Sequence, residues 1–242
     1  MEDMEIEKFF EALCSLDEDV VLEVSEEDAS KEKKQNDYCG MLDKSFPEPA
    51  LAHYWRDRED RILWIEDKID EDIIGVARNI VRWNHEDKDI PIEKRKPIKL
   101  YINSPGGLLT PTFAVCNAIL LSKTPIWAIN MHEAASAAAL IFACCHRRVA
   151  MPYAYFLLHL GAGGTYGTYQ QSKAQQEDYN HQIESLIGIF KKRLNLNDEL
   201  EKEFDTHIDG EWYLYMDITD ESKQNARRFN LVTDEIDNLI WE

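Results

Sequence analysis

Three short stretches of this chain carry residue types that together could transfer an acyl group. The glycine pair Gly106-Gly107 follows Pro105 after an apolar strand, Ser136 stands within a run of alanines, and His159 follows another apolar strand. A serine nucleophile needs a base that accepts its proton and backbone amides that stabilise the oxyanion. Each stretch alone is more often structural, as a turn, a helix cap or a hydrogen-bonded histidine. Their combination in this order predicts acyl-transfer chemistry by a serine.

The surroundings of the serine favour this chemistry. Small side chains around Ser136 leave its hydroxyl accessible, and they are expected to open a helix over residues 134–145. In the first turn of such a helix the amide of Ala137 has no helical partner, so it could donate to an oxyanion. His132, four residues before the serine, is a rival base.

Strands and helices alternate from about residue 60, which predicts an α/β fold with a largely parallel sheet. The pattern predicts strands over residues 61–66, 98–102, 125–131, 148–151 and 155–158. It predicts helices over residues 70–83, 110–121, 134–145, 170–194 and 222–228. In parallel sheets, sites gather at the carboxyl ends of strands, and all three stretches fall at such ends.

Charge divides the chain into two parts. The 242 residues carry a net charge of −19, and residues 1–50 alone hold 16 acidic and 5 basic side chains. We therefore expect an acidic extension and linker over residues 1–50 and one catalytic domain over residues 51–242. Such an excess of acid argues against nucleic acid or an anionic membrane as a partner.

Composition also bears on the compartment. The acidic start and the short apolar runs give no sign of a secretory signal or a membrane span. Five cysteines without metal-ligand spacing make disulfides and a metal site improbable. A reducing, cytoplasmic location is expected.

Specific motifs resemble one known family. They are the segments Leu100-Tyr101-Ile102-Asn103-Ser104-Pro105-Gly106-Gly107, Ala134-Ala135-Ser136 and Leu157-Leu158-His159. They are similar to the proteolytic subunit of the Clp protease, with 29 positions from Gly107 to Ser136 as in that family. The resemblance runs from about Arg61 to Val232 and leaves the acidic extension unmatched.

The resemblance implies a ClpP/crotonase-like fold of repeated β-β-α units, with residues 170–194 as a long handle helix. It implies Ser136 as nucleophile, His159 as base, and the backbone amides of Gly107 and Ala137 as the oxyanion hole. It also implies heptameric rings stacked as a tetradecamer, polypeptide substrates and an AAA+ unfoldase. That partner would use the ATP, so no cofactor or metal is expected in this chain.

The sequence leaves three candidates for the acid that would complete a catalytic triad with Ser136 and His159. Asp209 lies 50 positions after His159, near the family's spacing, whereas Asp217 fits better when counted back from Ala226. Asp205 is a third choice, and Asp209 is favoured. This chain also departs from the family at His132, where glycine is usual, and at Ala137, where methionine is usual.

These inferences favour a Clp-type serine endopeptidase that cleaves unfolded polypeptides inside a ring-shaped chamber. One alternative is a catalytically weakened scaffold subunit, which the uncertain acid and His132 keep open. A crotonase-like acyl-CoA enzyme is a further alternative, although such an enzyme has no need of the pair Ser136 and His159.

Overall fold

The computed structural model describes residues 49–216 and 224–236. The acidic extension expected over residues 1–50 therefore lies outside the described residues, except for its last two positions. A helix that the sequence pattern did not predict, α3 (Pro49–Glu59), crosses the expected boundary at residue 50. It packs against the first strand, where Trp64 Nε1 donates to an oxygen of Asp57 at 3.0 Å.

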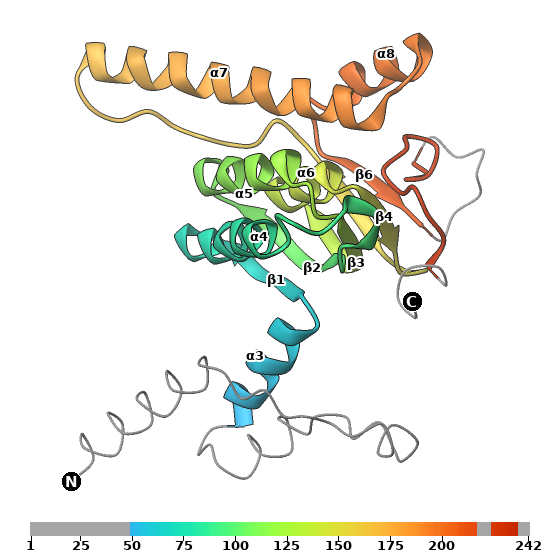
Figure 1. Cartoon of the computed structure of the whole chain (residues 1–242). Helices are drawn as coiled ribbons and strands as arrows, with labels where there is room; N and C mark the ends of the chain where they lie inside the picture. The colour runs from blue at the N-terminus through green and yellow to red at the C-terminus, as the bar shows by residue number, and fades with distance from the viewer. Residues whose placement is uncertain (1–48, 217–223, 237–242) are drawn as a thin grey trace, which may run out of the picture. The chain divides into compact units, whose positions relative to one another are not determined.

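A six-stranded sheet forms the centre of this unit (Figure 1). Its strands are β1 (Ile62–Ile69), β2 (Ile98–Gly107), β3 (Ile126–Ala135), β4 (Arg147–Ala150), β5 (Tyr155–Leu158) and β6 (Trp212–Tyr215). The order is β1-β2-β3-β5-β6, and β4 pairs with the first half of β3. All pairings are parallel except that of β5 with β6, so the expected largely parallel sheet is confirmed.

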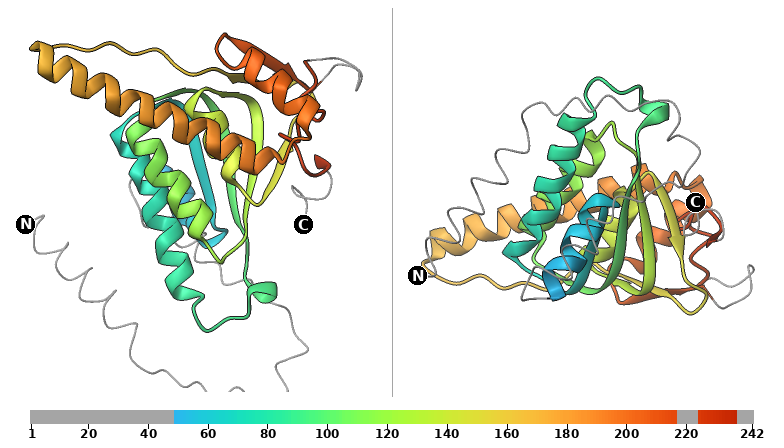
Figure 2. Two further views of the ribbon diagram at one scale, coloured as in Figure 1. Left: turned by 90° about the horizontal axis from the view of Figure 1, so that it is seen from above. Right: turned by 60° about the horizontal axis from the view of Figure 1, so that its bottom comes forward.

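Further helices pack on this sheet and on one another. They are η3 (Glu71–Ile73), α4 (Ile74–Glu86), η4 (Ile92–Lys94), α5 (Leu109–Leu121), α6 (Ala137–Cys144), α7 (Tyr169–Leu194) and α8 (Asp198–His207). Helices α4, α5 and α6 lie side by side on the sheet, and the long helix α7 crosses α6 and continues past it (Figures 1 and 2). The expected handle helix is therefore present, one residue longer than predicted.

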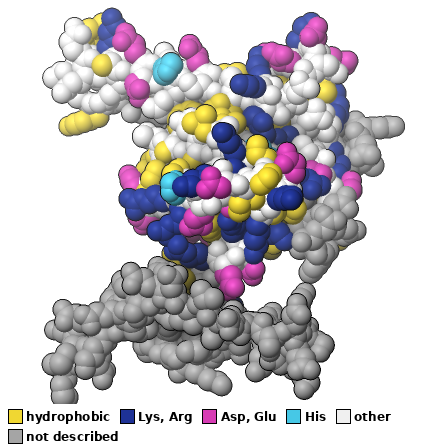
Figure 3. Space-filling view, viewed as in Figure 1, with side chains coloured by type: hydrophobic (Ala, Val, Ile, Leu, Met, Phe, Trp, Pro, Cys, Tyr) yellow, Lys and Arg dark blue, Asp and Glu magenta, His cyan; other side chains and the backbone are white. Residues whose placement is uncertain are grey.

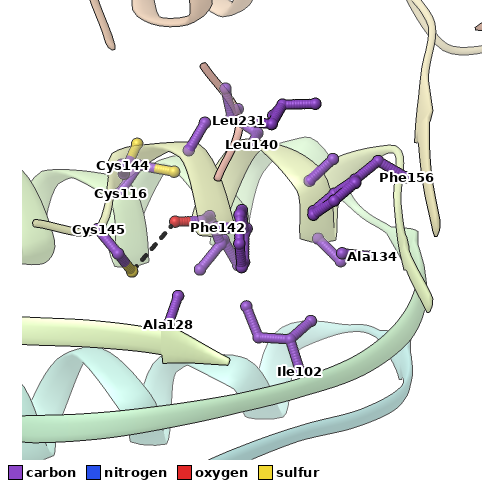
Figure 4. Packing of buried hydrophobic residues seen from close by; sticks show 14 of the residues in the cluster. Ile102, Cys116, Ala128, Ala134, Leu140, Phe142, Cys144, Cys145, Phe156 and Leu231 are labelled. Atoms are coloured by element: carbon purple, nitrogen blue, oxygen red, sulfur yellow. Dashed lines mark hydrogen bonds between the residues drawn. The ribbon is translucent and has the colours of Figure 1, made fainter. Parts of the chain in front are cut away.

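The core is centred on α6, which is buried on all sides. A helix that is apolar all round requires packing on every face. Phe142 packs on Phe156 of β5 with ring centroids 4.9 Å apart, and Cys144 lies beside Cys116 of α5 (Figure 4). Because α6 is enclosed, the residue that precedes it is also held in place.

Two strands run further than predicted. The strand expected over residues 98–102 continues through Pro105 to Gly107, and the strand expected over residues 125–131 continues to Ala135. Register shifts in both pairings of β2 accommodate the proline, which cannot donate to a ladder. The residues expected to form a turn are therefore the carboxyl end of a strand.

The end of the chain also differs from the prediction. The described part of the helix expected over residues 222–228 forms turns instead. The Asn225 side chain accepts from the Arg227 amide at 2.8 Å, and the Ala226 amide donates to Tyr215 O at 3.0 Å. Side-chain and cross-chain bonds of this kind compete with helix formation.

Candidate active site

Ser136 occupies the junction between β3 and α6. The helix expected from residue 134 begins only at Ala137, because Ala134 and Ala135 pair with β5. Ser136 has φ 54° and ψ −122°, which is a rare conformation for a residue with a side chain. Its amide donates to Leu157 O at 2.7 Å and holds it there. Such strain costs of order 1–3 kcal/mol and is typical of functional positions.

Gly106 brings the glycine stretch into contact with the serine. It has φ +89°, and a Cβ there would lie 2.6 Å from Ala135 O and 2.7 Å from Ser136 Cβ. The buried hydroxyl of Ser104 fixes this end of β2, since it accepts from the Gly106 amide at 3.1 Å and donates to Asp67 O at 2.5 Å. Only glycine allows β2 to approach the nucleophile this closely.

Two backbone amides are suited to an oxyanion beside Ser136. The first helical bond of α6 runs from the Leu140 amide to Ser136 O at 3.3 Å, so the helix does not use the Ala137 amide. On β2, the Leu108 amide donates to Ile69 O at 3.0 Å. Because donors alternate along a strand, the Gly107 amide is expected to face the opposite side, toward Ser136.

His159 lies one residue beyond β5, within hydrogen-bond distance of the serine. Its Nε2 is 2.7 Å from Ser136 Oγ, although the two residues are 23 positions apart. This separation suits proton transfer between a nucleophile and a base. The structure thus brings together the serine and the histidine that the sequence singled out.

A cleft of about 1040 Å³ opens over this pair. Its walls are mainly apolar and come from three parts of the chain: the β2–α5 junction, the segment after β5, and α7. The lining includes Gly107, Leu108, Ser136, His159, Leu160 and Leu186. Tyr179 of α7 donates its hydroxyl to Leu160 O at 3.2 Å, which ties one wall to the long helix.

The rival base is engaged elsewhere. His132 lies in β3 with ordinary extended backbone, rather than in a tight turn that it would crowd. Its Nδ1 is 3.1 Å from Tyr153 O, and its ring meets the edge of Tyr155 with centroids 5.4 Å apart. In this structure His132 therefore faces away from Ser136, because the strand presents its side chain to a different loop.

The two candidate acids that the structure describes, Asp205 and Asp209, do not contact the histidine. Asp209 is exposed in the turn that follows α8, and no hydrogen bond joins it to His159 within the described ranges. Asp205 is exposed on α8 and pairs with Lys191 at 2.8 Å. Asp217 lies outside the described residues. The assignment of the acid remains a prediction.

Two arginines that the sequence analysis overlooked hold the far end of α6. Arg148 Nη1 donates to Ala143 O at 3.1 Å, and Arg193 Nη2 donates to Cys145 O at 2.6 Å. Burial, together with the charge of Arg193, lowers the pKa of Arg148 to about 10. Cationic side chains stabilise the negative, carboxyl end of a helix. The signal for this role in the sequence was the pair Arg147-Arg148, which follows the apolar helix closely. Arg148 and Arg193 fix the helix that positions Ser136.

The arrangement of these residues indicates the class of chemistry that the site can perform. A serine bonded to a histidine, beside two backbone amides that could donate to an oxyanion, is suited to acyl transfer. The sequence model of the Clp protease family matches residues 53–211, so the chain belongs to the Clp protease family, and its fold is ClpP-like.

One curated relative supports the same placement. The chain is 31% identical, over 147 residues, to the ATP-dependent Clp protease proteolytic subunit 2 of Prochlorococcus marinus (strain MIT 9312). This match covers 60% of the chain and 66% of the relative. Within the described residues, no helix combines the length and apolar character needed to cross a bilayer.

Proposed function

We propose that this chain is a serine endopeptidase subunit of the Clp type, with Ser136 as nucleophile and His159 as base. The observation that carries the proposal is the 2.7 Å contact between His159 Nε2 and Ser136 Oγ at the edge of an apolar cleft. The strained backbone of Ser136 supports it, because an ordinary structural serine has no need of that conformation.

The reaction follows from the positions of these groups. Ser136 Oγ attacks the scissile carbonyl carbon while His159 Nε2 accepts its proton. The carbonyl oxygen becomes an oxyanion, which the amides of Gly107 and Ala137 stabilise. His159 then protonates the leaving amine as the C–N bond breaks. Water, activated by the same imidazole, hydrolyses the acyl-enzyme and regenerates the serine.

The substrate would be an extended polypeptide in the cleft. The residues from Leu160 to Gly163 run outside any strand of the sheet, opposite the end of β2. An extended chain laid between these segments would gain backbone hydrogen bonds, which carry little sequence information. Low sequence selectivity with a preference for apolar side chains is therefore expected.

The remaining parts of the proposal rest on the resemblance. Heptameric rings stacked as a tetradecamer, a cytoplasmic location and an AAA+ unfoldase that uses the ATP are all proposed on that basis. The name of the relative, an ATP-dependent proteolytic subunit, agrees with such a partner. The resemblance assigns the orienting carboxylate to Asp209, which would have to turn inward from its exposed position to reach His159.

Hydrolysis of a fluorogenic peptide by single variants tests the peptidase assignment. We expect Ser136→Ala and His159→Ala each to lower the turnover rate by at least about 1000-fold, because each removes a member of one catalytic unit. Ser185→Ala, a serine on α7 outside the cleft, serves as the matched control and should retain activity. Full hydrolysis by Ser136→Ala would contradict the mechanism, and no hydrolysis by the unaltered chain would favour the scaffold alternative.

A further inference from the structure

We infer that Glu71 determines part of the substrate specificity of the cleft, by favouring a lysine or arginine side chain of the polypeptide near the scissile bond. The inference rests on the proposed serine peptidase function and deepens it, since it gives the chemistry of one substrate side chain. It follows from the place of Glu71 at the sheet edge, from the charges of the cleft, and from the apolar residues between Glu71 and the nucleophile.

The end of β1 places Glu71 in the row of strand ends that forms the site. Strand β1 pairs with β2, and β2 pairs with β3, so these three strands end in that order along one edge of the sheet (Figure 1). The carbonyl oxygen of Ile69, the last residue of β1, accepts from the Leu108 amide at 3.0 Å. Glu71 follows two residues later and lines the same cleft as Ser136. Because neighbouring strands lie about 5 Å apart, β1 is about 10 Å from the strand that leads to the serine.

The turn after β1 fixes the backbone of Glu71 and does not use its carboxylate. The Asp70 side chain accepts from the Asp72 amide at 3.0 Å, and the Ile74 amide donates to the carbonyl oxygen of Glu71. Within residues 49–216 and 224–236, no side chain or amide donates to the Glu71 carboxylate. The carboxylate is therefore available to a group of the substrate.

Glu71 gives the cleft its charge. Among the described residues that line the cleft there is no lysine, arginine or aspartate, and the other titratable side chains are His159 and Tyr179. At a pH where His159 is a neutral base, the lining therefore carries one negative charge. Two charges attract or repel each other more strongly beside apolar protein than in bulk water. A cationic side chain is thus favoured in this cleft and an anionic one is disfavoured.

The residues between Glu71 and the nucleophile are apolar. Because β2 lies between β1 and β3, Leu108 and Leu109 at its carboxyl end separate Glu71 from Ser136. The side chain of Leu108 is 44% exposed, so it offers apolar surface to a ligand. Lysine and arginine combine a long apolar stem with a charged head. A stem that lies on these leucines brings the head to Glu71, so the preference adds to the apolar preference already expected for the cleft.

Hydrolysis of paired peptides by the full chain tests the inference. The two peptides of a pair differ at one position, which holds lysine in one and norleucine in the other, and this position is moved along the residues on both sides of the scissile bond. Norleucine keeps the apolar stem of lysine and lacks its charge. At one of these positions we expect Glu71→Gln to lower the ratio of kcat/KM for lysine over norleucine by about fivefold, the effect of a partly exposed ion pair. Glu71→Lys should lower this ratio further, and high salt should weaken the preference of the unaltered chain.

Asp72→Asn is the matched control, because Asp72 is an exposed acid of the same turn that does not line the cleft. It removes the same charge and should leave the ratio unchanged. A ratio that Glu71→Gln leaves unchanged at every position would overturn the inference, and so would an equal fall in Asp72→Asn, which would reflect the overall charge of the chain. Either result leaves the peptidase assignment intact. An unaltered chain that hydrolyses none of the peptides defeats the proposed function, and this inference with it.

Discussion

At the scale of single residues, the candidate site depends on a glycine, Gly106, that lies against the nucleophile. Gly106 lies against the backbone on either side of Ser136, and its φ of +89° is open to few other residues. The serine in turn keeps its own unusual φ because Leu157 O accepts its amide. Glycine and nucleophile are therefore parts of one local arrangement.

Gly106→Ala should damage both stability and reactivity. The added Cβ would overlap Ala135 and Ser136, so we expect a loss of about 2 kcal/mol or more in the free energy of unfolding. Covalent labelling of Ser136 by a fluorophosphonate probe, which reacts with nucleophilic serines, should slow in parallel. Gly188→Ala in α7, where a Cβ meets nothing within 4 Å, is the control and should be neutral or slightly stabilising. Equal melting temperatures for Gly106→Ala and the control would show that this contact is unimportant.

The residues that do chemistry were easier to predict than those that position them. Ser136 and His159 stand in recognisable motifs, and the structure brings them to 2.7 Å. The strand β6, which pairs with the strand before His159, had no clear alternation in the sequence. Its pairing with β5 joins segments more than 50 positions apart, and no local pattern reports such a register.

At the scale of elements, the sequence predicted which strands and helices exist better than where they end. Pro105 indicated the end of β2, yet register shifts carry the strand through it to Gly107. Helix α6 starts three residues late because Ala134 and Ala135 pair with β5. In both cases a pairing between distant segments overrides the local preference of a residue.

A buried ion pair joins three elements at the opposite end of the sheet. The Arg61 guanidinium at the start of β1 donates to both oxygens of Asp87 after α4, at 2.6 and 2.7 Å. Thr124, before β3, donates to the same carboxylate at 2.9 Å. The bonds from Arg61 hold the pKa of the Asp87 carboxyl below its usual value. This contribution to stability is present above the pKa of an unfolded aspartate and is lost as the pH falls through the lower folded value.

Asp87→Asn should therefore destabilise the chain most at neutral pH. We expect a loss of about 3 kcal/mol at pH 7, since Asp87 is only 1% exposed and its removal leaves Arg61 without its carboxylate. Between pH 5 and pH 2 the unaltered chain should lose more stability than the variant. Urea unfolding at several pH values measures both. Asp60→Asn, which breaks the exposed pair with Lys96, should change stability by less than about 1 kcal/mol. If the free energy of unfolding changes with pH in the same way for the unaltered chain and for Asp87→Asn, the proposed effect of the Asp87 pKa on stability is wrong.

At the scale of the whole molecule, the described residues leave apolar side chains on the surface. Basic, acidic and hydrophobic side chains are interspersed on the face shown in Figure 3. The side chains of Leu121, Tyr166 and Tyr169 are 82%, 92% and 78% exposed. Large exposed apolar groups are typical of contact surfaces. Two of them flank the start of α7, the helix that the resemblance places between two rings.

In the proposed tetradecamer, the double variant Tyr166→Ser, Tyr169→Ser should weaken the contact between the two rings. We expect the particle mass in solution to fall from that of a tetradecamer toward that of a heptamer, because the handle contact loses its aromatic area. Tyr153→Ser, in the turn between β4 and β5, removes a side chain of similar exposure and should leave the mass unchanged. Light scattering measures these masses. A monomer in the unaltered chain would contradict the proposed assembly.

The assignment of Ser136 as a nucleophile is the centre of this account, and covalent labelling addresses it most directly. The full chain is treated with a fluorophosphonate at a pH where His159 is neutral, and the adduct is located by mass spectrometry of the peptides. We predict one phosphonyl adduct on Ser136 Oγ in the unaltered chain and none in Ser136→Ala. An unaltered chain that carries no adduct at Ser136 would contradict the account.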